Sequence, residues 1–156
     1  MPNRVPYDQR SDLENIQSQW SKLSGLLNRG EWSAAVVRAA TAAEIAANFA
    51  IREESRAKSK LSSAFVDSLL SWANGLSGKL NHLLVPLCPG KAHQKTLKNL
   101  AKVASSVNEK RNGIAHRGEF CDAGESEAMI KQTKYFVEAL VGTYTPGFTL
   151  KHHGRV

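Results

Sequence analysis

Residues 32–56 read WSAAVVRAATAAEIAANFAIREESR, and this alanine-rich stretch decides the fold class. It is apolar around nearly its whole circumference, which is typical of a helix that other helices cover on most sides. The polar exceptions fall in one sector when the chain is turned by roughly 100° per residue; they are Arg38, Thr41, Glu44, Asn48 and Arg52. The stretch therefore predicts a central helix with one narrow polar stripe.

Helical patterns continue on both sides of this stretch. A capping-box sequence, Ser11 to Glu14, precedes apolar residues at helical spacing and predicts a helix over 12–28. Further along, the pattern predicts two short helices within 61–84, a long helix over 94–115 that a left-handed Gly118 ends, and a last helix over 125–144. No segment shows the alternation of a strand. We therefore expect an all-α fold, a bundle of four to five helices.

The domain organisation that follows is simple. We expect a flexible arm over residues 1–10, one helical domain over 11–145 and a frayed tail over 146–156. We expect Cys88 and Cys121 to be free thiols, because two cysteines are too few for a disulfide framework. With no signal-peptide pattern and no apolar run near the length of a bilayer span, we expect a cytoplasmic protein without membrane contact.

The chain is basic, with a net charge of +7, which favours an acidic partner such as nucleic acid. Most of the excess positive charge lies between Lys91 and Arg117, a segment with seven basic residues and one acidic residue. Four of them form a single stripe at helical spacing: Lys91, Lys95, Lys98 and Lys102. The stripe is either a solvated helix face or a track for an RNA backbone, to which Lys110 and Arg117 would also contribute.

The opposite face of this helix carries a packing seam that ends in an arginine. Its residues are spaced alternately by three and four positions: Leu97, Leu100, Ala104, Val107, Arg111 and Ile114. An unpaired guanidinium is costly to bury. Either the seam ends before Arg111, or its side chain extends outward to water, or a carboxylate or phosphate meets it there.

The end of the same helix reads KRNGIAHRG over residues 110–118, with Arg111 five positions before His116. Arginine supplies a fixed cation matched to phosphate oxygens, and histidine exchanges a proton near neutral pH. The pair is the minimum equipment for cleaving an RNA phosphodiester without a metal. The simpler interpretation is that His116 interacts with the last carbonyls of the helix.

The segment from Arg111 to His116 resembles the R-X4-6-H motif of the HEPN (higher eukaryotes and prokaryotes nucleotide-binding) superfamily, in which a polar residue such as Asn112 often follows the arginine. The Ala42-Ala43-Glu44 segment and the LSGKL segment at 76–80 are similar to HEPN proteins and to the mannitol-repressor-like family. In architecture the resemblance covers residues 12–144, but it is specific only over 109–118.

This resemblance implies a four- or five-helix bundle that dimerises and acts as a metal-independent endoribonuclease in toxin, antiphage or RNA-processing systems. His116 would act on the attacking 2′-hydroxyl or the leaving 5′-oxygen, Arg111 would stabilise the phosphorane charge, and Asn112 would orient one of them. Two copies of the motif would meet across a two-fold axis. Glu44 would orient Arg111 when no substrate is bound, or else it simply faces solvent.

The resemblance also implies an alternative function. Arg117 follows His116 where HEPN toxins paired with nucleotidyltransferases commonly have a tyrosine. Some members of the superfamily keep the helices without the nuclease activity. The second hypothesis is therefore a non-catalytic binding or regulatory module, of the mannitol-repressor-like kind or with an antitoxin or nucleotidyltransferase partner.

Other chemistries find no support in the sequence. His82, Cys88, His93 and Cys121 lack the paired short spacing of a zinc site, so no metal is expected. No glycine-rich nucleotide loop or nucleophile elbow is present, so we expect no cofactor. Trp20, Trp32 and Trp72 lie within apolar periodicity and are predicted to be core residues rather than platforms for stacking bases.

Overall fold

The computed structural model describes residues 5–73, 75–88 and 90–151, and every regular element in these ranges is helical. The long helices are α1 (Asp12–Asn28), α2 (Trp32–Lys58), α6 (Lys91–Arg117) and α7 (Ala123–Tyr144). The short elements are η1 (Tyr7–Gln9), α3 (Ser63–Trp72), α4 (Leu76–Gly78), the π-helical η2 (Lys79–Leu84) and α5 (Val85–Leu87). The all-α class is confirmed. The helices are more numerous than the four to five predicted, because the chain between α2 and α6 divides into α3 and the α4–η2–α5 run.

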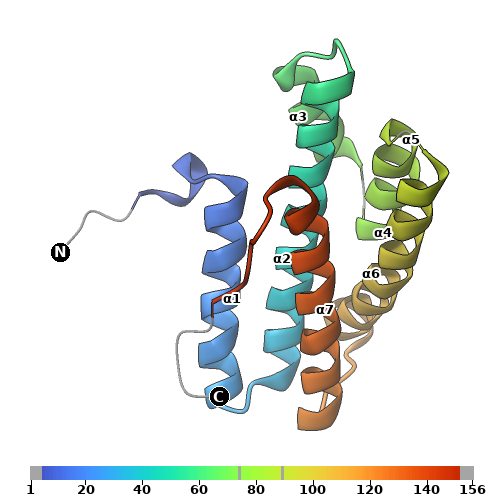
Figure 1. The fold of residues 1–156 in the computed structure, drawn as a ribbon. Helices are drawn as coiled ribbons and strands as arrows, with labels where there is room; N and C mark the ends of the chain where they lie inside the picture. The colour runs from blue at the N-terminus through green and yellow to red at the C-terminus, as the bar shows by residue number, and fades with distance from the viewer. Residues whose placement is uncertain (1–4, 74, 89, 152–156) are drawn as a thin grey trace.

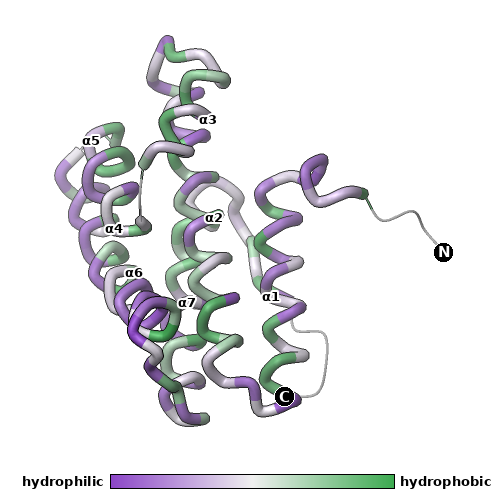
Figure 2. The backbone as a smooth tube through the Cα atoms, turned by 180° about the vertical axis from the view of Figure 1, so that it is seen from behind, coloured by the Kyte–Doolittle hydropathy of each residue, from purple (hydrophilic) through white to green (hydrophobic). Residues whose placement is uncertain are grey.

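The helix α2 is central, as its composition predicted. It contacts α1, α3, α6 and α7, and α1, α2 and α7 lie side by side with α6 beyond them (Figure 1). Hydrophobic residues concentrate on α2 and α7, while hydrophilic residues run along α6 (Figure 2). The buried alanines of α2 present only methyl groups, so neighbouring helices can approach closely; they include Ala39, Ala43, Ala46 and Ala50.

The first and last long helices cover α2 with large apolar side chains. Trp20 and Ile16 of α1 and Phe136 and Leu140 of α7 are all fully buried. The predicted capping box is present, since the Ser11 hydroxyl accepts a hydrogen bond from the Glu14 amide at 3.2 Å. The cap satisfies an amide that the first turn of α1 cannot pair internally.

The helix α6 is bounded by two glycines with positive φ. It begins at Lys91, three residues before the predicted start, after Gly90 with φ 97°. It ends at Gly118, which is left-handed at φ 66° as predicted. Leu97 and Val107 of the seam are buried, whereas Arg111 is only partly buried. The packing seam therefore ends before the arginine.

Two predictions about single segments are wrong. Trp72 is 82% exposed rather than buried, because Val66 and Leu70 share the buried face of α3 and Trp72 lies two positions, or about 200° of rotation, beyond Leu70. The tail does not fray at 148–151: Leu150 is buried, and the Gln17 side chain exchanges two hydrogen bonds with the backbone of Lys151, at 2.7 and 3.0 Å. Residues 152–156 lie outside the described part of the chain.

Within the described residues, α2 is the one helix that is long and apolar enough to cross a bilayer by length and composition. The sequence was expected to contain no apolar run near the length of a bilayer span, and α2 differs from that expectation. Of its most apolar 18-residue window, 56% is buried inside the bundle. A helix that packs on several sides needs this many apolar residues in any case.

Candidate functional site

The three residues of the predicted motif converge near the end of α6. Arg111 Nη1 donates a hydrogen bond to Asn112 Oδ1 at 3.0 Å and lies 3.4 Å from His116 Nε2. Asn112 and His116 are one helical turn apart, so they share a face. The long side chain of Arg111 reaches across Asn112 to the imidazole, and the helix itself fixes the positions of all three.

The contact between the guanidinium and the imidazole constrains the histidine. A guanidinium has only donors, so His116 Nε2 can take part in this 3.4 Å contact as a hydrogen-bond partner only as an acceptor. The contact therefore requires the tautomer of His116 that leaves the lone pair of Nε2 free to accept. Nε2 becomes free to take a proton from a hydroxyl when the guanidinium turns from the imidazole to another acceptor.

The motif lines a pocket of about 460 Å³ between α2, the start of α4 and α6. Its walls are formed by Ala40, Thr41, Glu44, Gly75, Leu76, Asn108, Arg111, Asn112 and His116. Asn108 was not predicted at all, and Thr41 was predicted as part of the polar stripe but not as a residue of the site. Asn108 lies one turn before Asn112 on the same helix, so its helical spacing was a usable signal.

Glu44, which was predicted to orient Arg111, pairs with Lys79 instead. Glu44 lines the pocket, but its Oε1 accepts a hydrogen bond from Lys79 Nζ at 2.8 Å. Among the described contacts, no hydrogen bond or ion pair joins Glu44 to Arg111. The Lys79 side chain is only 4% exposed, whereas that of Glu44 is 46% exposed. A buried ammonium needs a partner more than a half-exposed carboxylate does, which explains why Lys79 takes Glu44.

Because of this pairing, the guanidinium of Arg111 keeps unused donors. Its hydrogen bonds to described residues all use Nη1, so Nε and Nη2 make none to this part of the chain. Glu44 and Lys79 compensate each other's charge, which leaves Arg111 as the uncompensated cation among the described residues of the pocket. A pocket of this kind suits an anion such as a phosphate diester.

The predicted basic stripe forms one surface of α6. Lys91, Lys95, Lys98 and Lys102 line a shallow groove together with Gln94 and Asn99. No ion pair within the described residues involves any of the four lysines. Their charges are therefore not balanced by neighbouring side chains.

The other two predicted RNA contacts already have partners. Lys110 Nζ lies 2.7 Å from Glu125 Oε2, and Arg117 Nε lies 3.1 Å from Glu119 Oε1. The hydrogen bond from Lys110 to Glu125 raises the pKa of the Lys110 ammonium above its usual value. Both side chains are less available to a phosphate than the four lysines of the stripe.

Comparison with models of protein families, with curated proteins and with solved structures found no significant match to this chain. The site must therefore be interpreted from its own residues.

The pairing of Glu44 with Lys79 gives a stability test. In Glu44→Gln the buried ammonium of Lys79 loses its counter-ion, and we expect the free energy of unfolding in urea to fall by about 1–3 kcal/mol. This is less than the roughly 3–5 kcal/mol of a fully buried pair, because Glu44 is half exposed.

The matched control is the double variant Glu44→Gln/Lys79→Met, which also removes the buried charge. It should recover at least half of the lost stability. A single variant as stable as the parent protein would show that Lys79 does not depend on Glu44.

Proposed function

We propose that this protein is a metal-independent endoribonuclease of the HEPN type, which cleaves RNA by attack of a ribose 2′-hydroxyl on the adjacent phosphate. One observation carries the proposal: Arg111 lies within hydrogen-bonding reach of both Asn112 and His116, and all three residues line one pocket. In this arrangement His116 is the general base, Arg111 is the cation beside it, and the amide of Asn112 holds the guanidinium in place.

The reaction follows from these groups. When RNA binds, the guanidinium of Arg111 turns to the phosphate and releases His116 Nε2. His116 Nε2 then removes the proton of the 2′-hydroxyl, and the 2′-oxygen forms a bond to phosphorus. The bond from phosphorus to the 5′-oxygen breaks, and that oxygen takes a proton from an acid. The products are a 2′,3′-cyclic phosphate and a 5′-hydroxyl, so no water and no metal enters this step.

Arg111 supplies the electrostatic part of the mechanism. Negative charge accumulates on the non-bridging oxygens as the phosphorane forms, and the free donors on Nε and Nη2 can bind them. The hydrogen bond to Asn112 restrains the guanidinium, so less side-chain entropy is lost when RNA binds. Asn112 is a positioning residue in this scheme.

A homodimer completes the proposed site. One chain provides a single imidazole, whereas the reaction uses a base and an acid. His116 of the partner subunit would be that acid if two pockets met across a two-fold axis. Phe120, four residues after His116, is 88% exposed, which is unusual for a phenylalanine and suits a contact with the second subunit.

The uncompensated lysines of α6 extend the proposed site towards the start of the helix. They lie on the helix that carries the motif, and no described acid pairs with them. A single-stranded or looped RNA whose backbone follows this stripe would place its reactive linkage at His116. Phosphate contacts of this kind bind without reading sequence.

The biological setting belongs to the same proposal. We place the protein in the cytoplasm, where the free thiols Cys88 and Cys121 would stay reduced, in toxin, antiphage or RNA-processing work. An antitoxin or a nucleotidyltransferase is a possible partner. The alternative is a regulatory helical module that binds its ligand at Arg111 without turnover.

Cleavage assays test the nuclease proposal. Protein incubated with a fluorescent single-stranded RNA in EDTA should produce fragments that end in a 2′,3′-cyclic phosphate. His116→Ala and Arg111→Ala should each lower the rate by about 100-fold or more, because general base and charge stabilisation each contribute that much.

The matched control is His82→Ala, since His82 is an exposed histidine outside the motif and should be dispensable. Cutting that is equal in His116→Ala and the parent protein would exclude the mechanism. RNA binding without cutting in any protein would instead favour the regulatory module.

Sedimentation equilibrium tests the dimer. The parent protein should sediment as a dimer, and Phe120→Ser should raise the dissociation constant by about 10-fold or more, as expected for truncation of a buried aromatic at an interface. Tyr135→Ser, a change at an aromatic on α7 that is 64% exposed, serves as the control. A monomer that cuts RNA at full rate would contradict the dimeric site.

The salt dependence of RNA binding tests the lysine stripe. Replacing its four lysines with glutamine should flatten the plot of log K against log salt by up to about 3, because each lost phosphate contact contributes roughly 0.7 for a single strand. The control changes four exposed lysines outside α6 and lowers the net charge equally: Lys22, Lys60, Lys131 and Lys151. Equal slopes in the two variants would mean that only global charge matters.

A further inference from the structure

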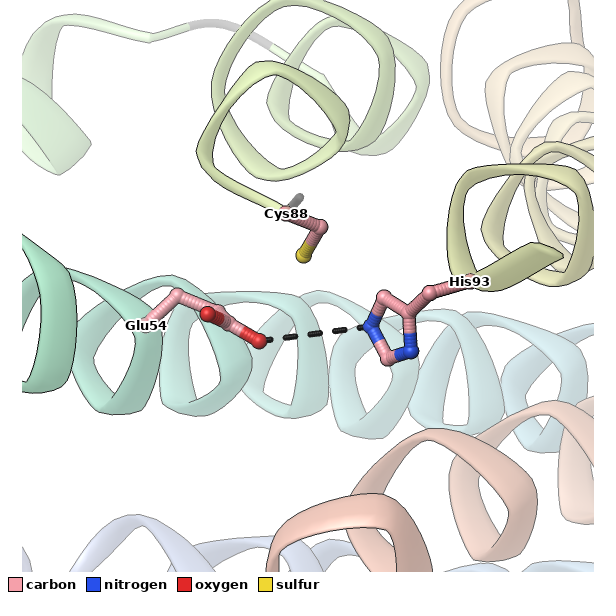
Figure 3. A group of neighbouring side chains, drawn as sticks. All are labelled: Glu54, Cys88 and His93. Carbon is pink, nitrogen blue, oxygen red and sulfur yellow. Dashed lines mark ion pairs between the residues drawn. The ribbon is translucent and has the colours of Figure 1, made fainter. Parts of the chain in front are cut away.

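A second cluster of reactive side chains lies away from the pocket, where α2, α5 and α6 come together. Glu54 belongs to the last turns of α2, Cys88 follows α5 directly, and His93 lies in the first turn of α6. Figure 3 shows the carboxylate, the sulfur and the imidazole pointing into one space. A carboxylate oxygen of Glu54, Sγ of Cys88 and a ring nitrogen of His93 each offer one ligand atom, and these atoms lie within 4.8 Å of one another.

Hydrogen bonding explains only part of this cluster. Tyr144 Oη donates to Glu54 Oε1 at 2.7 Å, and Lys58 Nζ forms a close ion pair with Oε2 at 2.6 Å. The pKa of Glu54 is lowered: burial raises it, and the combined effect of Lys58, Tyr144 and Cys88 outweighs burial. The carboxylate is therefore an anion in a site where its side chain is 5% exposed.

His93 has no such explanation within the described residues. Its Nε2 is a buried atom without a hydrogen-bond partner in this part of the chain, and Glu54 Oε1, at 4.0 Å, is too far away to accept a proton from it. A buried polar atom without a partner calls for an explanation, and an ion held jointly with the nearby carboxylate and thiol supplies one.

We propose that Glu54, Cys88 and His93 form a zinc-binding site that joins the end of α2 to the junction of α5 and α6. Sulfur, imidazole nitrogen and carboxylate oxygen are together the ligands that zinc takes, whereas magnesium and calcium take oxygen alone. In a tetrahedral zinc site the ligand atoms are about 3.4–3.6 Å apart, given the usual bond lengths. Small side-chain shifts would close the present spacing.

Charge and access also fit this ligand set. When the ion binds, Cys88 would release its proton to solvent, and the resulting thiolate together with the carboxylate would neutralise the divalent ion, so the site would carry no net charge. The Lys58 side chain is 40% exposed and can move into solvent when the metal replaces it beside Glu54. Tyr144 would remain bonded to the carboxylate and hold it in orientation. The His93 side chain is 36% exposed, so one ligand residue of the site reaches the surface, and water would be the fourth ligand.

The proposed zinc site is separate from the RNA pocket. Glu54 follows Glu44 by ten residues, or about 15 Å along α2, and His93 precedes Arg111 by eighteen residues, or about 27 Å along α6. The ion would not touch the proposed reaction. It would hold the segment between α3 and α6 against α2, and zinc that binds only the folded chain stabilises that chain.

Cobalt(II) is the probe, because it takes zinc sites and gives visible spectra. The full chain carries His152→Ala and His153→Ala so that the tail histidines cannot bind metal, and it is treated with EDTA and kept in a reductant without thiols. Titration should give the strong d–d bands of tetrahedral cobalt and a thiolate charge-transfer band, both saturating at one ion per chain. Zinc should abolish both.

Three variants locate the site. Cys88→Ser should lose the charge-transfer band and weaken binding by at least about 100-fold, the upper end of the cost of losing even an outer partner of a ligand. His93→Gln should weaken binding to a similar extent. Cys121→Ser removes the other free buried cysteine and should change neither band.

Circular dichroism and melting of the metal-free proteins establish that the variants fold. If Cys88→Ser unfolds, the cobalt titration of His93→Gln tests the site instead. The His93 side chain is partly exposed, so its replacement should cost little stability. A titration without a thiolate band, or binding that persists in His93→Gln, overturns the proposal and leaves a purely hydrogen-bonded cluster.

Discussion

The small side chains of α2 are the constraint on which the rest of the structure depends. The buried alanines of α2 let three long helices, α1, α6 and α7, pack closely against it, and larger residues there would push these helices away. Close packing brings the polar stripe of α2 within reach of α6. Thr41 and Glu44 therefore form one wall of the pocket whose other wall carries Arg111 and His116.

The sequence predicted those parts of the fold that local patterns determine. Apolar spacing and the Ser11 cap placed α1 at its observed limits, and Gly118 ended α6 where expected. It failed where a contact joins distant residues. Leu150 is buried, and the adjacent Lys151 bonds to Gln17 of α1, 134 positions away. The apolar spacing around Trp72 is the same whether or not another helix covers α3.

The two polar sites show the same contrast between residues close together in the sequence, which could be predicted, and contacts between distant segments, which could not. The proposed catalytic residues come from one stretch of α6, so their spacing in the sequence already placed them together. Lys79 could not be assigned to Glu44 in this way, because the pair joins α2 to η2. The cluster around Glu54 gathers residues from three segments, and rules of metal-ligand spacing that look for short repeats do not recognise it.

The packing of the two chain ends has a practical consequence. Arg10 bonds to the backbone of Val5 and to Ser18 of α1, and Lys151 bonds to Gln17 of α1, so both ends of the described chain are held to this helix (Figure 1). The face formed by α6 is on the other side of the bundle. A fusion or an immobilising tag attached at either end would therefore leave that face open, and the molecule could be displayed on a support in one orientation.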